Sequence, residues 1–381
     1  MPYDLSKLLI QTLLRPVSDA TAALARLDER VARSPVGAGW IERSHFADAC
    51  ASLWIDGELV HLEDLVLHDA GADIRAPTHE LTIARDVLRT RRRIAAQPPG
   101  WALSADGLRS LRGQLAEDAA DISADDNEPT GAPEPSVALA PVGGGEGDGR
   151  EIGPADPLEK ELAAIDAVIA RSEAAIAEVR SAGRRIEREK DPLVYDLDWD
   201  EDARLGDWGA ALEGTDGLPP VLRAIVALDA WNELQVLQHA PWLGRLLAGS
   251  VLHEAGLTTA EHLVAFNLGL KNIPVERRRH RDRDTRLSAL THGLIVAAQF
   301  GLKEHDRLTL ARQLMERRLT DKRTSSKLPE LIELVMTRPL VSAGMVAEAL
   351  KITPRAALRI VEELGLREMT GRGRFRAWGV M

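Results

Sequence analysis

The amino-acid sequence predicts a mostly α-helical protein that ends in a winged helix-turn-helix with a small β-hairpin. Strong helix formers such as Ala, Leu, Arg and Glu dominate, whereas aromatic residues make up only 4% of the chain. Apolar residues recur at helical spacing through most of the chain, for example over residues 3–33 and 79–96. Only the segment from residue 328 onward combines short helices, tight turns and a strand pattern. These three observations define the predicted fold class.

Composition narrows the class of protein further. A chain of 381 residues with 45% hydrophobic content can build two or three domains of ordinary size. Its one cysteine, Cys50, excludes a disulfide framework and fits a reducing compartment. No apolar run is long enough to cross a bilayer, and the first residues lack a signal-peptide pattern. We therefore expect a cytoplasmic protein that is not bound to a membrane.

Four segments follow from the composition along the chain. We expect an N-terminal helical domain over 1–120, a disordered acidic linker over 121–157, a helical core over 158–325 and a winged helix-turn-helix over 326–381. The linker is rich in Pro, Gly and acidic residues, and it cannot bury enough apolar surface to offset its ordering entropy. Residues 158–179 predict a long amphipathic helix, which either pairs with another helix or, as we favour, lies on the core of the protein itself.

Two other parts of the sequence are candidates for a metal site. The acidic stretch 196–208 contains two tryptophans, but it lacks the closing Glu of a calcium loop, so it predicts a solvated connecting loop. His253 and His262 are too far apart for a His-Glu-x-x-His zinc site. The sequence therefore predicts neither a metal nor a cofactor.

The charge of the chain is divided unevenly. The whole chain carries −11, yet residues 271–381 carry +10, so the first 270 residues carry −21. This division predicts a basic, nucleic-acid-facing C-terminal part on an acidic body. The run ERRRHRDRDTR at 276–286 contributes to it. Its interleaved acids fit a salt-bridged helical face at least as well as a phosphate-binding patch.

The segment from residue 328 has the helix signals of a helix-turn-helix. A first apolar helix is expected to stop near Pro339, and Ser342 is a good N-cap for a second helix. Thr353 supplies the cap oxygen of a third helix, and Pro354 occupies its first position, where a missing N–H costs nothing. Gly365 suits the left-handed conformation that ends a helix. Two short strands are expected to follow.

The third helix of this segment is predicted to enter a DNA major groove. Arg355 and Arg359 are one helical turn apart on its polar side, and a guanidinium can bind guanine O6 and N7 through two donors. Lys351 and the start of the helix at Thr353 would contact phosphate groups. Because one short helix reads too few base pairs for specificity, we expect a homodimer on duplex DNA.

The predicted hairpin adds a basic wing. By strand alternation, Arg372, Arg374 and Arg376 share one face, whereas Phe375 and Ala377 share the other. The complete set of predicted DNA-binding residues is Lys351, Thr353, Arg355, Arg359, Arg372, Arg374 and Arg376. Small winged helices also serve in protein docking and dimerisation, and this alternative stays open.

Two motifs resemble the Fic-domain proteins. The stretch HAPWLGRLL at 239–247 resembles the two ends of their His-Pro-Phe-x-x-Gly-Asn-Gly-Arg loop and the helix that follows it. The stretch SLWIDGELVHLEDL at 52–65 resembles the helix end and next helix entry of the domain that commonly precedes the Fic core. Ser52, Ile55, Asp56 and Gly57 carry that second match.

The resemblance implies a lost catalytic site. His239 matches the base that acts on a target hydroxyl, and Gly244 and Arg245 match the helix start after the loop. Only residues 240–243 lie between them, so the glycines and Asn that cradle nucleotide phosphates have no counterparts. We therefore expect no enzyme activity and no bound nucleotide, with His239 in a structural or partner-binding role.

The same resemblance sets expectations for the neighbouring residues. A helix salt bridge is favoured for Arg245 over an anion contact. Ser52 and Asp56, which restrain the active loop in the family, are expected to have only packing roles.

A second resemblance concerns the whole chain. The stretches SLWIDGELVHLEDLVLHDAGADIRAPTHELT at 52–82 and GRGRFRAWG at 371–379 are similar to an uncharacterised rhizobial family. That family pairs a domain of unknown function, of the DUF1612 type, with a C-terminal helix-turn-helix DNA-binding domain. The function of the family is not established, so this similarity concerns architecture.

The function expected from these patterns is sequence-specific DNA binding by a transcriptional regulator. Its inactive Fic-like body would dimerise or sense a ligand or partner. One alternative is a protein-interaction module, such as an antitoxin-like partner of an active Fic protein. The other is a divergent nucleotidyl transferase, for which the chain offers no suitable phosphate loop. The glycine-rich run at 143–149 is acidic and would repel phosphate.

Overall fold

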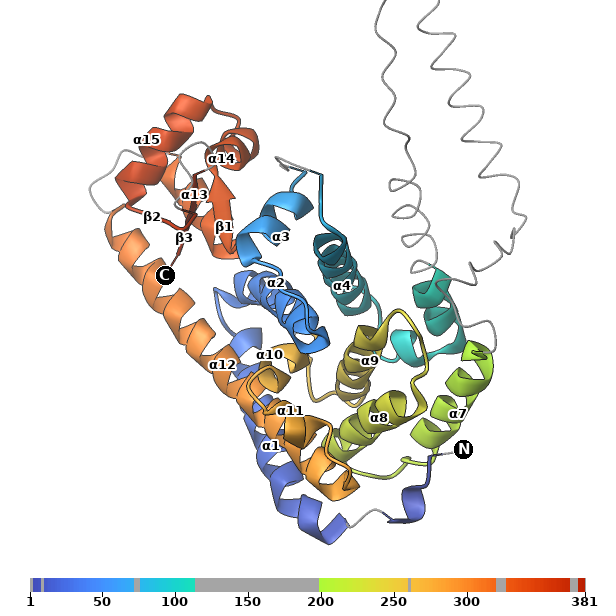
Figure 1. Cartoon of the computed structure of the whole chain (residues 1–381). Helices are drawn as coiled ribbons and strands as arrows, with labels where there is room; N and C mark the ends of the chain where they lie inside the picture. Colours follow the sequence, from blue (N-terminus) through green and yellow to red (C-terminus); the bar gives the residue numbers. More distant parts are fainter. Residues whose placement is uncertain are drawn as a thin grey trace, which may run out of the picture. The chain divides into compact units, whose positions relative to one another are not determined.

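The computed structural model describes residues 3–7, 10–71, 76–113, 199–259, 262–319, 327–370 and 376–380. The predicted linker and the amphipathic helix predicted over 158–179 lie outside these ranges. The described residues are mostly helical, with three short strands near the C-terminus (Figure 1). The predicted fold class, mostly α with a C-terminal helix-turn-helix and a small hairpin, is confirmed.

The two longest helices among the described residues lie side by side and run in the same direction. They are α1 (Ile10–Ala32), which follows the 3₁₀ turn η1 (Leu5–Lys7), and α12 (Arg283–Arg317). Their contact depends on Gly301, because a Cβ at that position would lie 2.8 Å from Leu27 and 2.9 Å from Trp40. The indole of Trp40 also donates a hydrogen bond to the carbonyl of Gly301 at 2.9 Å. The glycine thus lets helices α1, α2 and α12 pack closely.

A second group of helices precedes the undescribed segment. It consists of α2 (Gly37–Asp56), α3 (Leu62–Asp69), α4 (His79–Ala95) and the 3₁₀ turn η2 (Trp101–Leu103). The predicted start at Thr78 is confirmed, since its hydroxyl accepts a hydrogen bond from the amide of Leu81 at 3.3 Å. Helix α2 ends at Gly57, which has φ of +100° and so adopts the left-handed conformation that glycine favours.

Residues 201–208 of the acidic stretch predicted to be a connecting loop are helical, so that prediction is wrong for this part. Helix α7 (Glu201–Glu213) begins after Asp200, whose carboxylate accepts a hydrogen bond from the amide of Ala203 at 2.9 Å. Carboxylates in the first turn stabilise a helix through its dipole, so the acidic residues mark a helix start. Trp208 is buried and donates to the carbonyl of Ala227 at 2.9 Å.

The centre of the body contains two largely buried helices. They are α8 (Pro220–Leu234) and α9 (Pro241–Glu254), and they precede two short helices, α10 (Phe266–Leu270) and α11 (Val275–Arg278). Pro241 is the first residue of α9, and Trp242 is packed, with 3% exposed. A Cβ at Gly244 would lie 2.3 Å from the indole of Trp231. Packing against that ring therefore explains this glycine without any phosphate loop.

A buried ion pair, together with the hydrogen bonds around it, connects residues from both sides of the predicted linker. Arg91 on α4 binds Asp48 on α2 at 2.5 Å, and both side chains are at most 1% exposed. Asp48 also accepts hydrogen bonds from the side chain of Asn267 and the amide of Leu268, at 2.7 and 2.9 Å. Arg91 in turn donates to the carbonyl of Leu263 at 2.9 Å. Residues predicted to form two separate domains, 1–120 and 158–325, therefore share one core over their described parts.

The C-terminal module, residues 328–380, contains three helices and three strands. In chain order these are α13 (Leu328–Thr337), β1 (Leu340–Ser342), α14 (Ala343–Leu350), α15 (Pro354–Leu364), β2 (Arg367–Glu368) and β3 (Ala377–Gly379). The three helices follow the predicted order. Strand β1 was not predicted, and it pairs antiparallel with β3, so that β3 is the central strand of the order β1-β3-β2. Val341 pairs with Trp378, which places an apolar strand where the sequence suggested a plain connection.

Two buried histidines lie close to the central ion pair. Burial lowers the pKa of His262 to about 4 despite Asp28, whose carboxylate lies 3.6 Å from its Nδ1. Burial and the neighbouring Arg91 hold the pKa of His45 well below its usual value. The rings of His262 and Trp40 pack at nearly a right angle, with their centroids 5.2 Å apart. Both histidines are therefore neutral in the folded protein at neutral pH.

Acid should destabilise the fold through these histidines. The unfolded chain binds a proton at His262 below its ordinary pKa of 6.5, whereas the folded chain does not until about pH 4. The stabilising contribution is thus complete above pH 6.5 and declines as the pH falls. Between pH 6.5 and pH 5 we expect a loss of about 2 kcal/mol from this residue. Denaturant unfolding of the wild type and His262→Gln at both pH values measures it, and equal losses in the two proteins would refute the assignment.

Candidate nucleic-acid interface

The helix-turn-helix is built by capping residues that the sequence predicts correctly. Ser342 caps α14 by accepting from the amide of Met345, and Thr353 caps α15 by accepting from the amide of Ala356, both at 3.2 Å. Gly365 ends α15 with φ of +69°. The turn between the helices contains a feature that was not predicted, because Lys351 adopts the left-handed conformation with φ of +54°. This conformation ends α14 and redirects the chain into α15.

Helix α15 presents two arginines to solvent. Its buried face consists of Ala357, Ile360, Val361 and Leu364. Arg355 and Arg359 are exposed one turn apart on the other side, and neither is hydrogen-bonded or ion-paired to any residue in the described ranges. Lys351 and Thr353, at the start of the helix, are exposed as well. This side of α15 is thus open to a ligand, with two unneutralised guanidinium groups.

The wing supports only part of the prediction. Arg372 and Arg374 lie outside the described residues. Arg376 is exposed, but its guanidinium binds the carboxylate of Glu368 at 2.8 Å and lies 5.1 Å from the ring centre of Trp378. Ala377 is buried as predicted, and Trp378 is buried too, because β3 has a neighbouring strand on each side. A ligand would therefore have to compete with Glu368 for Arg376.

The module is attached to the body through backbone carbonyls. Arg43 on α2 donates to the carbonyls of Val335, Arg338 and Pro339 at the end of α13. A Cβ at Gly39 would lie 2.5 Å from the carbonyl of Met336, so α2 approaches α13 closely.

Three further side chains complete this attachment. Arg338 binds Asp69 at 3.2 Å, Arg307 donates to the carbonyl of Val380 at 2.6 Å, and Arg318 donates to the carbonyl of Leu364. Lys351, Arg355 and Arg359 take no part in the hydrogen bonds and ion pairs of this attachment.

The two motifs that resemble Fic-domain proteins, at 52–65 and 239–247, contact each other through their side chains. Arg245 on α9 makes a bidentate ion pair with Asp56 at the end of α2, at 3.0 and 2.6 Å. It also donates to the hydroxyl of Ser52 at 2.9 Å. The prediction of a salt bridge for Arg245 is confirmed, whereas the expectation of mere packing roles for Ser52 and Asp56 is wrong. His239 is exposed immediately before α9.

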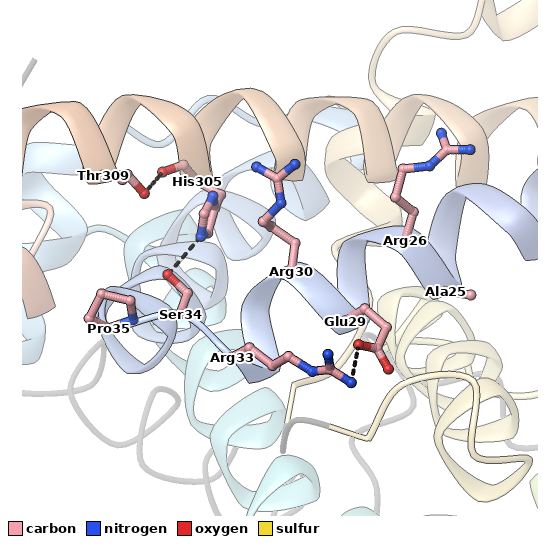
Figure 2. Close-up of a pocket in the computed structure, with 9 residues that line it drawn as sticks. All are labelled: Ala25, Arg26, Glu29, Arg30, Arg33, Ser34, Pro35, His305 and Thr309. Atoms are coloured by element: carbon pink, nitrogen blue, oxygen red, sulfur yellow. Dashed lines mark hydrogen bonds and ion pairs between the residues drawn. The ribbon is translucent and has the colours of Figure 1, made fainter.

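A shallow groove of about 770 Å³ runs between α1 and α12. Figure 2 shows Arg26 and Arg30 extending from α1 toward α12, and Arg33 turned toward Glu29. Arg33 binds Glu29 and Arg30 binds Asp306, both at 2.9 Å. To the left of Arg30 in this view, the side chains of His305 and Ser34 form a hydrogen bond at 2.7 Å. Carboxylates already neutralise two of the three arginines, so the groove has little excess charge for an anion.

The described part of the chain contains neither a metal-binding cluster nor a membrane-spanning helix. Within the described ranges, no three His, Cys, Asp or Glu side chains are arranged to hold a metal ion. No helix in the same part of the chain is long and apolar enough to cross a membrane.

Two segments of the chain match known protein families. Residues 193–320 match the family described as a protein of unknown function (DUF1612), and residues 328–381 match an HTH DNA-binding domain. The chain is 65% identical over 385 residues to the uncharacterized protein y4cF of Sinorhizobium fredii (strain NBRC 101917 / NGR234), with 100% of both chains covered. The predicted similarity to a rhizobial family that combines these two domains is confirmed.

The Arg245–Asp56 pair should be structural and strongly coupled. Asp56→Ala leaves a guanidinium that is only 6% exposed without its carboxylate, and we expect it to lower the free energy of unfolding by about 3 kcal/mol. The double variant Asp56→Ala/Arg245→Met removes the stranded charge, so most of that loss should be recovered. Denaturant titration of the four proteins in this cycle measures the coupling. Simple additivity of the two single changes would contradict it.

Proposed function

This chain belongs to the same family as y4cF, with a DUF1612 region followed by an HTH DNA-binding domain, and from this premise we propose that it is a sequence-specific transcriptional regulator. The proposal assigns base reading to Arg355 and Arg359 and backbone contacts to Lys351, Thr353, Arg372, Arg374 and Arg376. The body would serve in dimerisation or in sensing a ligand or partner.

One observation carries the proposal. In a segment that matches an HTH DNA-binding domain, the second helix of the motif bears two exposed arginines without a described partner. Surface arginines on this protein are commonly neutralised, as Arg30, Arg33 and Arg312 are by nearby carboxylates. Two unneutralised guanidinium groups near the start of a recognition helix suit the acceptor atoms of guanine. The order helix, strand, helix, helix, strand, strand also supports a winged form of the motif.

For the body we propose a Fic-like scaffold without catalytic function. The contact of Ser52 and Asp56 with Arg245 supports the scaffold, because two motifs far apart in sequence lie together as they would in such a protein. The lack of a phosphate-binding loop between His239 and Gly244 supports the loss of activity. Helix α9 begins in that interval, and Trp242 fills the space with a packed indole.

A homodimer is part of the proposal. A single recognition helix contacts few base pairs, and two copies related by a two-fold axis would read a palindrome with half-sites about one helical turn apart. The competing function is protein docking, in which the exposed face of α15 binds an acidic protein surface. Arg355 and Arg359 would serve that function equally well, so DNA selection has to decide between the two.

Selection of bound sites from a random duplex pool tests the DNA-binding function. The intact protein should enrich one motif, and a palindromic motif would add the dimer. Arg355→Ala/Arg359→Ala should weaken binding to that motif by at least about 30-fold, because each base contact contributes about 1–3 kcal/mol. Arg26→Ala/Arg33→Ala removes the same charge from the α1 groove and should retain the motif. No enriched motif with the intact protein would favour the docking function.

Labelled ATP tests the proposed absence of nucleotidyl transfer. The purified protein, incubated with radiolabelled ATP and a lysate of its host, should transfer no label above the background of His239→Ala. An active Fic protein serves as the positive control. Label transfer by the wild type that is lost in His239→Ala would show that the site has kept its activity.

A further inference from the structure

The positive charge of the C-terminal part lies mostly outside the helix-turn-helix. Residues 328–381 carry only +2 of the +10 found from residue 271 onward, and residues 271–327 carry +8. The segment that holds most of this charge begins directly after α10 and contains all of α11 and α12.

Carboxylates neutralise much of the charge on α12. Arg283 and Arg286 both bind Asp229 and Glu233, which lie on α8. Arg307 binds Glu304 at 2.5 Å, and Arg312 binds Glu316 and Glu333 at 2.8 and 2.5 Å. The second half of the run 276–286 is therefore salt-bridged, as one of the two readings of its sequence predicted.

The cations before α12 are arranged differently. None of them is ion-paired within the described ranges, and together with one tryptophan they form what we call the α11 patch: Lys271, Arg277, Arg278, Arg279, Arg281 and Trp54. The ammonium of Lys271 lies 5.4 Å from the ring centre of Trp54, whose side chain is 41% exposed. Arg278 is anchored by a hydrogen bond of 3.0 Å to the carbonyl of Ile273.

Several positive charges surround Arg278, the partly buried member of this patch. Partial burial lowers the pKa of Arg278, and the nearby guanidinium groups of Arg279 and Arg245 lower it further. Asp56 and Glu276 oppose this effect, but both oxygens of Asp56 already bind Arg245. Repulsion among like charges raises the free energy of the unliganded surface, and a bound anion relieves it.

We infer that the α11 patch binds phosphate groups of a nucleic-acid backbone, as a second contact in addition to helix α15. The inference rests on the proposed DNA-binding function, and it names a further part of the same ligand. A backbone is a long polyanion, and it can contact several separate guanidinium groups, whereas a single small anion cannot. The first 270 residues carry −21 and repel a polyanion elsewhere, so the patch offers a local surface of opposite sign. The partly exposed Trp54 adds an aromatic surface beside the phosphate-binding groups.

The salt dependence of DNA binding by the full-length protein tests the inference. Arg277→Ala/Arg279→Ala removes two exposed cations and leaves the anchored Arg278 in place. If each contacts one phosphate, the slope of log K against log salt should become shallower by about 2, and affinity near physiological salt should fall roughly tenfold. The effect should be equal for the selected site and for a random duplex, because phosphate contacts carry no sequence information. Arg26→Ala/Arg33→Ala is the control of equal charge, and unchanged melting temperatures verify folding.

The outcomes separate this inference from the proposed function. A shallower slope in Arg277→Ala/Arg279→Ala but not in the control supports the patch. Equal slopes in these two variants would overturn it, even if a motif is selected through α15. If no motif is selected and Arg355→Ala/Arg359→Ala binds normally, but the patch variant binds weakly, the patch stands and the proposed function fails. If the wild type retains no duplex DNA, both fail and the patch serves an acidic protein.

Discussion

The buried ion pair between Asp48 and Arg91 determines where helix α2 lies, and most of the functional geometry depends on that helix. A carboxylate without water is stable only when its oxygens are fully hydrogen-bonded, and Asp48 meets this condition through Arg91, Asn267 and the amide of Leu268. These partners come from α4 and from α10, so one side chain sets the mutual positions of three elements. Replacing this carboxylate by an apolar group would leave the guanidinium of Arg91 uncompensated in the core.

Helix α2 makes three different contacts along its length. Its first turns hold the helix-turn-helix module through Gly39 and Arg43, its middle holds the ion pair, and its last turn holds α9 through Ser52 and Asp56. The module is therefore linked to the body by specific hydrogen bonds and not by a chain segment alone. A change that tilts α2 would therefore alter both the α9 contact and the attachment of α13.

The sequence predicted what depends on local signals and missed what depends on distant partners. The caps at Thr78, Ser342 and Thr353 were correct because a hydroxyl before a helix satisfies an amide within the same turn. Strand β1 was missed because three residues form a strand only when β3 supplies their hydrogen bonds. The acidic start of α7 was misread because carboxylates suit both loops and helix N-termini. No local pattern could pair Asp56 with Arg245, 189 residues away, and this contact was not predicted.

The stretch that most suggests an enzyme is explained by packing. Gly244 lies against the indole of Trp231, where a side chain has no room, and Arg245 neutralises Asp56. Both residues resemble parts of a nucleotide-binding helix start, yet each has a structural partner that accounts for its presence. Buried cations such as Arg91 and Arg245 are bound by carboxylates, whereas Arg355, Arg359 and the cations of the α11 patch have no ion-pair partner within the described ranges. The arginines that lack an ion-pair partner in the described residues are therefore the ones available to a ligand.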